Sequence, residues 1–154
     1  TMQLSTRRSR RAFAAALLAT ALPLVAVGTA HASTTESGCT VSPLTPVFSY
    51  LNAAGDKVIR YNLTATCDAD RTVEIEQRVY EADIADADDL IVSFDRSRYF
   101  GATSTVTMWL EDALPDTEAG QEEMYQRVSF RVESGVVASP WTAWEDSSQQ
   151  QFSN

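Results

Sequence analysis

The stretch KVIRYNLTATC, residues Lys57–Cys67, decides the fold class of this chain. From the third residue on, its odd positions are apolar or bear a thiol, and its even positions are polar. A period of two places alternate side chains on opposite faces of an extended strand, whereas a helix requires a period near 3.6. The stretch therefore predicts a half-buried β-strand with an inward face made of Ile59, Tyr61, Leu63, Ala65 and Cys67.

The same alternation recurs along the chain. Five further segments show it, at Val73–Val79, Leu90–Phe94, Val106–Leu110, Met124–Val132 and, after a Ser134-Gly135 turn, Val137–Trp141. The earlier segment Cys39–Asn52 contains Pro43 and Pro46, which cannot donate to a ladder and therefore indicate an interrupted edge strand. About seven short strands separated by turns predict an all-β fold, an immunoglobulin-like antiparallel β-sandwich.

The connection after Cys67 bears on how the strands are arranged. Cys67 continues the inward series, and Thr72 belongs to the outward face of the next strand. A four-residue loop at Asp68–Arg71 would pair these two residues, although directly opposed residues share a face. Either the loop has five residues, or the chain crosses here to the other sheet.

Residues 1–32 have the features of a cleavable bacterial signal peptide. Arg7, Arg8, Arg10 and Arg11 precede an apolar run, and Ala30-His31-Ala32 forms a small-x-small cleavage site. A membrane anchor is the alternative, but the run is at the short end of the ~20 apolar residues that a spanning helix needs. We expect cleavage after Ala32, a domain over residues 33–146 and a flexible tail over residues 147–154.

The route of export stays open at this point. Ser9-Arg10-Arg11-Ala12-Phe13 resembles the twin-arginine export motif, but four arginines in one leader often produce an Arg-Arg pair that the general secretory route tolerates. Both routes lead to a secreted, extracellular protein.

The charge of the chain excludes several classes of partner. The formal net charge is −9, and residues 1–32 hold four of the 12 basic residues and none of the 21 acids. After cleavage, eight basic residues face 21 acids, so the formal charge becomes −13. Such a surface disfavours nucleic acid and anionic membrane surfaces, and it favours solubility outside the cell.

The content of histidine and cysteine restricts the chemistry. The one histidine, His31, lies within the predicted signal peptide, so the exported chain lacks the usual general base of serine and cysteine hydrolases. It also lacks imidazole for a transition-metal site, and we expect no cofactor. Cys39 and Cys67 are an even pair in an exported chain, which predicts a disulfide. Paired carboxylates are the catalytic chemistry that remains, and with 21 acids such pairs also arise by chance.

Two local features are weighed as binding sites. The acidic cluster around Glu81 contains the weak calcium candidates Asp83, Asp86, Asp88 and Asp89, but it lacks the spacing of an EF-hand, and a solvated acidic connection is the favoured interpretation. The second feature is a set of weak ligand-binding candidates, Trp109, Trp141 and Trp144. Trp109 falls on the nominally outward face of its strand, but the favoured interpretation is that the C-terminal segment partly covers this face and that Trp141 and Trp144 cap the core.

These observations predict a secreted, non-catalytic immunoglobulin-like domain without catalytic residues. Its expected role is the binding of an extracellular protein or cell-surface component of unknown identity. A glycan-binding module, which needs an exposed aromatic surface, and a small carboxylate-dependent hydrolase, which needs two acids in a cleft, are the alternatives.

Overall fold

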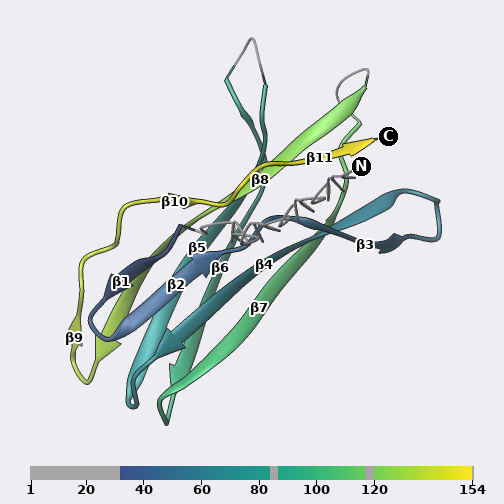
Figure 1. Cartoon of the computed structure of the whole chain (residues 1–154). Coiled ribbons are helices and arrows are strands. Elements are labelled where there is room, and N and C mark those ends of the chain that lie inside the picture. The colour runs from purple at the N-terminus through teal and green to yellow at the C-terminus, as the bar shows by residue number, and fades with distance from the viewer. Residues whose placement is uncertain (1–31, 84–86, 117–119, 154) are drawn as a thin grey trace, which may run out of the picture.

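The computed structural model describes residues 32–83, 87–116 and 120–153. All regular secondary structure in these ranges is β-strand, and the strands form two antiparallel sheets (Figure 1). Buried side chains of both sheets join in one core cluster. The all-β, two-layer organisation predicted from the alternating pattern is therefore confirmed. No helix in the described ranges is long and apolar enough to span a membrane.

The first sheet, sheet A, is centred on β4 (Lys57–Cys67). One side of β4 pairs with β7 (Ser104–Ala113) over ten consecutive positions. The other side is divided, since β3 (Val47–Leu51) pairs with the beginning of β4 and β2 (Cys39–Pro43) pairs with its end. The short strand β1 (Thr34–Glu36) lies outside β2. The break between β2 and β3 covers residues 44–46, next to Pro43 and including Pro46. It was predicted from these prolines, because a proline has no N–H to donate to the ladder.

The second sheet, sheet B, is centred on β5 (Arg71–Glu81). This strand pairs with β6 (Asp89–Phe100) on one side and with β8 (Gln121–Ser134) on the other. The free side of β8 pairs with three short C-terminal strands, which are β9 (Val137–Ala138), β10 (Glu145–Asp146) and β11 (Gln150–Ser153).

The chain crosses between the sheets directly after β4. The loop from β4 to β5 spans residues 68–70, and Asp70 in it adopts a φ of 58°. Cys67 ends a strand of sheet A and Thr72 pairs within sheet B, so the two residues never face each other. Of the two explanations for the conflicting parity, the crossing to the other sheet is the correct one.

A buried polar layer lies within the sandwich beside two apolar clusters. The larger cluster contains Leu63, Ile75 and Phe130, and the smaller one contains Tyr61 and Met124. The layer is built on two glutamines, Gln77 of β5 and Gln126 of β8, whose side chains are fully buried. The pattern of apolar residues did not predict them, because each occupies an inward position that the alternation assigns to a hydrophobic side chain.

The two glutamines connect the sheets through hydrogen bonds. The Gln77 Nε2 donates to Gln126 Oε1 at 2.6 Å and to the Tyr61 carbonyl of β4 at 3.1 Å. The Gln126 Nε2 donates to the carbonyls of Leu44 and Asn62, each at 2.6 Å. One amide therefore links β8 both to β4 and to the proline-containing segment between β2 and β3. Because an unsatisfied buried polar group is costly, this network holds the two sheets in a single relative position.

Arg96 of β6 extends the glutamine network to β7, an edge strand of sheet A. β6 and β7 are the edge strands of the two sheets on this side. The Arg96 guanidinium donates to Gln77 Oε1 at 2.6 Å and to the carbonyl of Trp109 in β7 at 3.3 Å. Partial burial lowers the pKa of Arg96 from its ordinary value. The side chain thus bridges two edges that share no backbone ladder among the described residues.

The predicted disulfide between Cys39 and Cys67 is present. The two residues are directly opposed in the register of β2 and β4, and their Cα atoms lie 4.1 Å apart. Both are buried in the larger core cluster, as the inward position of Cys67 predicted. The bond therefore attaches the N-terminal edge of sheet A to its central strand.

Three predictions about local structure need correction. Residues 147–154 were expected to form a flexible tail, but β11 pairs with β8 and Phe152 packs against the smaller cluster. Val137 was expected to face the core, but it pairs with Ser134 and is 68% exposed, because Gly135 and Val136 form the turn. Phe94 of β6 points inward and remains 48% exposed, because β6 lies at the edge of its sheet.

The predicted signal peptide lies almost entirely outside the described residues. They begin at Ala32, so cleavage and export remain expectations from the sequence.

Replacing both cysteines by alanine should destabilise the domain. The bond joins residues 28 positions apart, and in the chain-entropy model a ring of this size contributes roughly 3–4 kcal/mol. For a domain of this length the loss corresponds to a decrease of about 10 °C in the melting temperature. Calorimetric melting of the Cys39→Ala, Cys67→Ala double variant checks it, and melting at the wild-type temperature would show that the bond contributes no stability.

Replacing Gln126 by leucine should also be costly, although the new side chain is apolar. The substitution removes the hydrogen bonds to Leu44 and Asn62 and leaves Gln77 without its amide partner. We expect a loss of about 3 kcal/mol in the free energy of unfolding, measured by urea titration. The control Gln150→Leu, at an exposed position of β11, should change it by less than about 0.5 kcal/mol. Equal effects of the two variants would contradict the role assigned to the buried amide.

Candidate functional site

The outer face of sheet B carries arginine side chains stacked on aromatic rings. Arg131 of β8 lies over Trp141 at 5.2 Å from the ring centre, and Arg78 of β5 lies over Trp144 at 4.4 Å. Both tryptophans belong to the segment between β9 and β10, which runs over the sheet edge. A planar guanidinium stacks favourably on an aromatic face. This stacking, rather than core packing, explains why the two tryptophans lie on the outside.

The same arginines also form ion pairs with carboxylates. Arg131 bonds Glu74 at 2.7 Å, and Arg78 approaches Glu76 at 3.5 Å. A third arginine, Arg127 of β8, pairs with Asp146 at 2.6 Å. Each of these three arginines is thus already satisfied by a carboxylate within the face, and exposed pairs of this kind add little stability.

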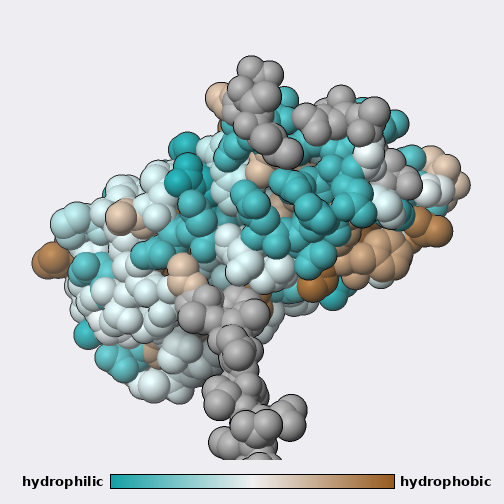
Figure 2. Space-filling model, turned by 45° about the horizontal axis from the view of Figure 1, so that its top comes forward, coloured by the Kyte–Doolittle hydropathy of each residue, from teal (hydrophilic) through white to brown (hydrophobic). Residues whose placement is uncertain are grey.

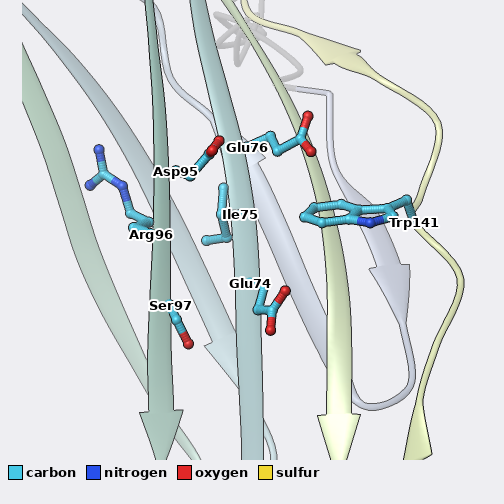
Figure 3. Close-up of a pocket in the computed structure, with 7 residues that line it drawn as sticks. All are labelled: Glu74, Ile75, Glu76, Asp95, Arg96, Ser97 and Trp141. Atoms are coloured by element: carbon cyan, nitrogen blue, oxygen red, sulfur yellow. The ribbon is translucent and has the colours of Figure 1, made fainter.

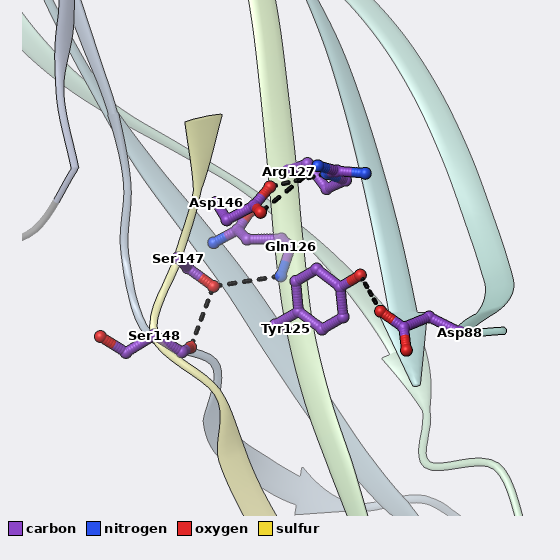
Figure 4. Close-up of polar contacts among 7 residues, drawn as sticks. All are labelled: Asp88, Tyr125, Gln126, Arg127, Asp146, Ser147 and Ser148. Carbon is purple, nitrogen blue, oxygen red and sulfur yellow. Dashed lines mark hydrogen bonds and ion pairs between the residues drawn. The ribbon is translucent and has the colours of Figure 1, made fainter. Parts of the chain in front are cut away.

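Figure 4 shows how the C-terminal segment is held against β8. The hydroxyl of Ser147 accepts a hydrogen bond from the backbone N–H of Gln126 at 3.1 Å and donates to the carbonyl of Ser148 at 3.0 Å. The backbone N–H of Ser147 donates to the Gln126 carbonyl at 2.8 Å. These contacts keep residues 147 and 148 in place beside the strand, where a flexible tail was expected.

Tyr125, the residue before Gln126 in β8, contacts the β5–β6 connection. Its ring stacks on Tyr80 at 5.5 Å between centroids, and its hydroxyl donates to Asp88 at 2.5 Å (Figure 4). Burial, followed by the hydrogen bond and the charge of Asp88, raises the pKa of Tyr125 well above its ordinary value. Asp88, one of the weak calcium candidates, therefore already serves as the acceptor of a phenol.

The acidic connection between β5 and β6 is described only in part. Asp86 lies outside the described residues, and Asp88 and Asp89 are exposed. Asp83 contributes its backbone N–H to the Asp88 carboxylate at 3.3 Å. Among the described residues no three histidine, cysteine or carboxylate side chains gather as they would around a metal ion.

A shallow groove of about 340 Å³ lies on the outer face of sheet B. Figure 3 shows Glu74 and Glu76 pointing toward Trp141, while Arg96 points away to the other side of the sheet. Asp95 of β6 is directly opposite Glu76, an arrangement of like charges that costs stability. The groove is acidic, and the ring of Trp141 at its border is 40% exposed.

The outer face of sheet A has a different character. Trp109 of β7 is directly opposite Asn62 of β4 and is 55% exposed, so it points outward as its parity predicted. The expected cover by the C-terminal segment is wrong, because the C-terminal strands pair with β8 of sheet B. Beyond it the neighbouring positions carry hydroxyl groups. Opposed pairs of them are Thr64 with Thr107 and Thr66 with Thr105, the latter joined by a hydrogen bond of 2.7 Å.

A small polar network holds Trp109 in position. Arg60 of β4 lies over the indole at 5.6 Å and bonds Glu111 of β7, with its Nε 2.8 Å from Oε1. Ser49 of β3 donates to the same Glu111 oxygen at 2.7 Å. The hydrogen bonds from Ser49 and Arg60, and the positive charge of Arg60, lower the pKa of Glu111 from its ordinary value. The pair has no net charge, so the face around Trp109 is neutral.

A third exposed surface lies at the end of sheet A that contains β3. Figure 2 shows a hydrophobic patch in this region. The exposed apolar side chains of β3 are Val47, Phe48, Tyr50 and Leu51, each between 46% and 58% exposed.

Two carboxylates of neighbouring strands are buried inside the sandwich. Glu81 of β5 and Glu122 of β8 are 2% and 0% exposed. They project from neighbouring strands into the sandwich, since Glu81 is opposite Met124, two residues from Glu122. Their burial keeps them from a substrate in this structure. The sequence placed Glu81 in an acidic cluster and did not indicate that its side chain is buried, because inward positions of these strands were expected to be apolar.

Comparisons with protein-family models, curated proteins and solved structures find no match to this chain. The functional interpretation therefore depends on the geometry of the two faces.

Acidification should release Trp109 from its network. Since the pKa of Glu111 is lowered in the folded protein, the stabilisation from its hydrogen bonds is present at neutral pH and is lost as the pH falls through that pKa. We expect the indole N–H resonance of Trp109 to move with a midpoint below the ordinary glutamate value of about 4.3. In Glu111→Gln this transition should disappear. A transition that persists in the variant would assign the change to another acid.

Proposed function

We propose that this chain is an exported, non-catalytic, immunoglobulin-like domain that binds a component of a cell surface or an extracellular protein. The strand order supports the immunoglobulin-like assignment. In it, β2, β4 and β7 correspond to strands A, B and E, and β6, β5 and β8 correspond to C′, C and F, with the C-terminal strands in the place of G. The cysteine pair departs from antibody domains, because it joins two strands of one sheet.

The observation that carries the binding role is the contrast between the two outer faces. On sheet B, the three arginines of the outer face pair with carboxylates and stack on aromatic rings of the same chain. On sheet A, Trp109 is exposed among uncharged polar side chains, and its position is held by Arg60 and Glu111. An exposed aromatic ring held in a fixed geometry is the type of group that contributes most to binding energy. Sheet A therefore provides the binding face in this proposal.

Export supports an extracellular partner. The predicted signal peptide, the buried disulfide and the strongly acidic composition all suit a protein that acts outside the cell. A fold alone does not specify a function, so the proposal is confined to the surface and the compartment.

A charge placed on sheet A should abolish binding. The exported protein is expected to sediment with the envelope fraction of the bacterium that produces it. Thr107→Glu introduces a charge next to Trp109, whereas Ser93→Glu introduces the same charge on the exposed outer face of sheet B, opposite Arg78. We expect Thr107→Glu to remain in the supernatant and Ser93→Glu to sediment like the wild type, with both variants melting normally.

Two results would refute the proposal. One is the failure of the wild-type protein to bind envelope material or any purified surface protein. The other is loss of binding in Ser93→Glu with retention in Thr107→Glu, which would place the binding face on sheet B.

A further inference from the structure

We propose that the outer face of sheet A binds an uncharged polysaccharide chain of a cell surface, with Trp109 and Tyr50 as the two rings on which sugars stack. This inference rests on the proposed binding function and specifies the chemistry of the partner.

The register places the two aromatic residues on one face. Trp109 is opposite Asn62 of β4, and Tyr50 is opposite Val58, four residues away along the same strand. Position 58 has the same parity as Arg60 and Asn62, and directly opposed residues lie on the same side of a sheet. Tyr50 follows a register shift after Phe48 and is 48% exposed, although its partner Val58 is buried. Trp109 and Tyr50 flank β4 on opposite sides, so strand spacing and rise put their Cα atoms roughly 16 Å apart. A chain of several sugar rings spans this distance.

The surface between the rings supplies hydrogen-bonding groups. Arg60 of β4 lies on the diagonal between Tyr50 and Trp109, Glu111 lies opposite it on β7, and Ser49 of β3 bonds Glu111. Sugars present hydroxyl groups around an apolar ring face, and planar guanidinium and carboxylate groups bind such hydroxyls in pairs. Because Arg60 and Glu111 already bind each other, their geometry is fixed before a ligand arrives, which reduces the entropic cost of binding.

The charge distribution favours an uncharged ligand. The run from Ser37 to Gly55, which contains β2 and β3, has no charged residue, and the run from Gly101 to Leu110 has none either. The whole chain carries a formal charge of −9, so an anionic polysaccharide would be repelled. The neutral face is therefore matched to a neutral chain.

The aromatic residue of sheet B does not fit this ligand as well. Trp141 borders a groove lined by Glu74, Glu76 and Asp95, whereas the residues around Trp109 have no net charge. Carboxylates this close together favour a cationic group over a sugar. Trp141 is nevertheless exposed and aromatic, which makes it a matched control for Trp109.

Affinity electrophoresis of the exported protein through gels that contain a polysaccharide tests the inference. The uncharged probes are β-glucan, mannan and soluble chitin oligomers, and the anionic probe is polygalacturonate. We expect at least one uncharged probe to retard the protein and polygalacturonate to have no effect. The affinity for that probe should fall by roughly tenfold or more in Trp109→Ala and also in Tyr50→Ala, and it should be unchanged in Trp141→Ala.

Each contrary result has a separate meaning. Binding to the envelope without retardation by any uncharged probe would overturn the polysaccharide inference and leave the proposed binding function intact. Retardation that is lost in Trp141→Ala and kept in Trp109→Ala would move the ligand to sheet B. Retardation by polygalacturonate alone would refute the charge argument.

Discussion

The buried amide of Gln126 is the contact on which the arrangement of the sandwich depends. It joins β8 to β4 and to the segment that precedes β3, and through Gln77 it connects to β5 and Arg96. An apolar core of two sheets tolerates sliding, because hydrophobic contacts have no direction. A network of directed hydrogen bonds between buried groups has one satisfied geometry, and any displacement leaves a buried donor or acceptor unpaired. The relative position of the two outer faces follows from this layer.

The difference between the two faces follows from where the chain places its charges. Sheet B receives the acidic and basic residues, which neutralise one another along β5 and β8 and hold the C-terminal segment through stacked tryptophans. Sheet A receives long uncharged segments, with one arginine and one glutamate that hold the exposed Trp109. The charged groups of one face thus bind each other and the C-terminal segment, and the other face presents an exposed aromatic ring to the solvent. This strongly acidic protein therefore has one face on which the charges around the exposed ring cancel.

The alternation of apolar and polar residues predicted most of the strands. It failed where contacts between side chains of different strands determine the position of a residue. The strands at β4, β5, β7 and β8 follow from the period of two, and the inward position of Cys67 predicted the disulfide. The outward side of Trp109 also follows from that period. The same parity placed Trp141 on the core side, which is wrong, because its position is set by stacking on Arg131 at the outer face of β8.

The remaining errors have similar physical causes. The alternation along β6 assigns Phe94 to the core side. The alternation does not indicate, however, that β6 is an edge strand, where an inward side chain remains partly exposed. The ordering of residues 147–153 depends on hydrogen bonds to β8 and on the packing of Phe152, neither of which a polar Ser-Gln sequence indicates. The buried glutamines occupy inward positions where the pattern expects apolar residues, and their network appears only in three dimensions.

The central claim is that sheet A, and not sheet B, is the binding face. The indole N–H resonances of Trp109, Trp141 and Trp144 report on the two faces within one nuclear magnetic resonance spectrum. When soluble envelope fragments are added to the exported protein, this account predicts that the Trp109 resonance shifts or broadens while the resonances of Trp141 and Trp144 stay in place. A response confined to Trp141 and Trp144 would contradict it.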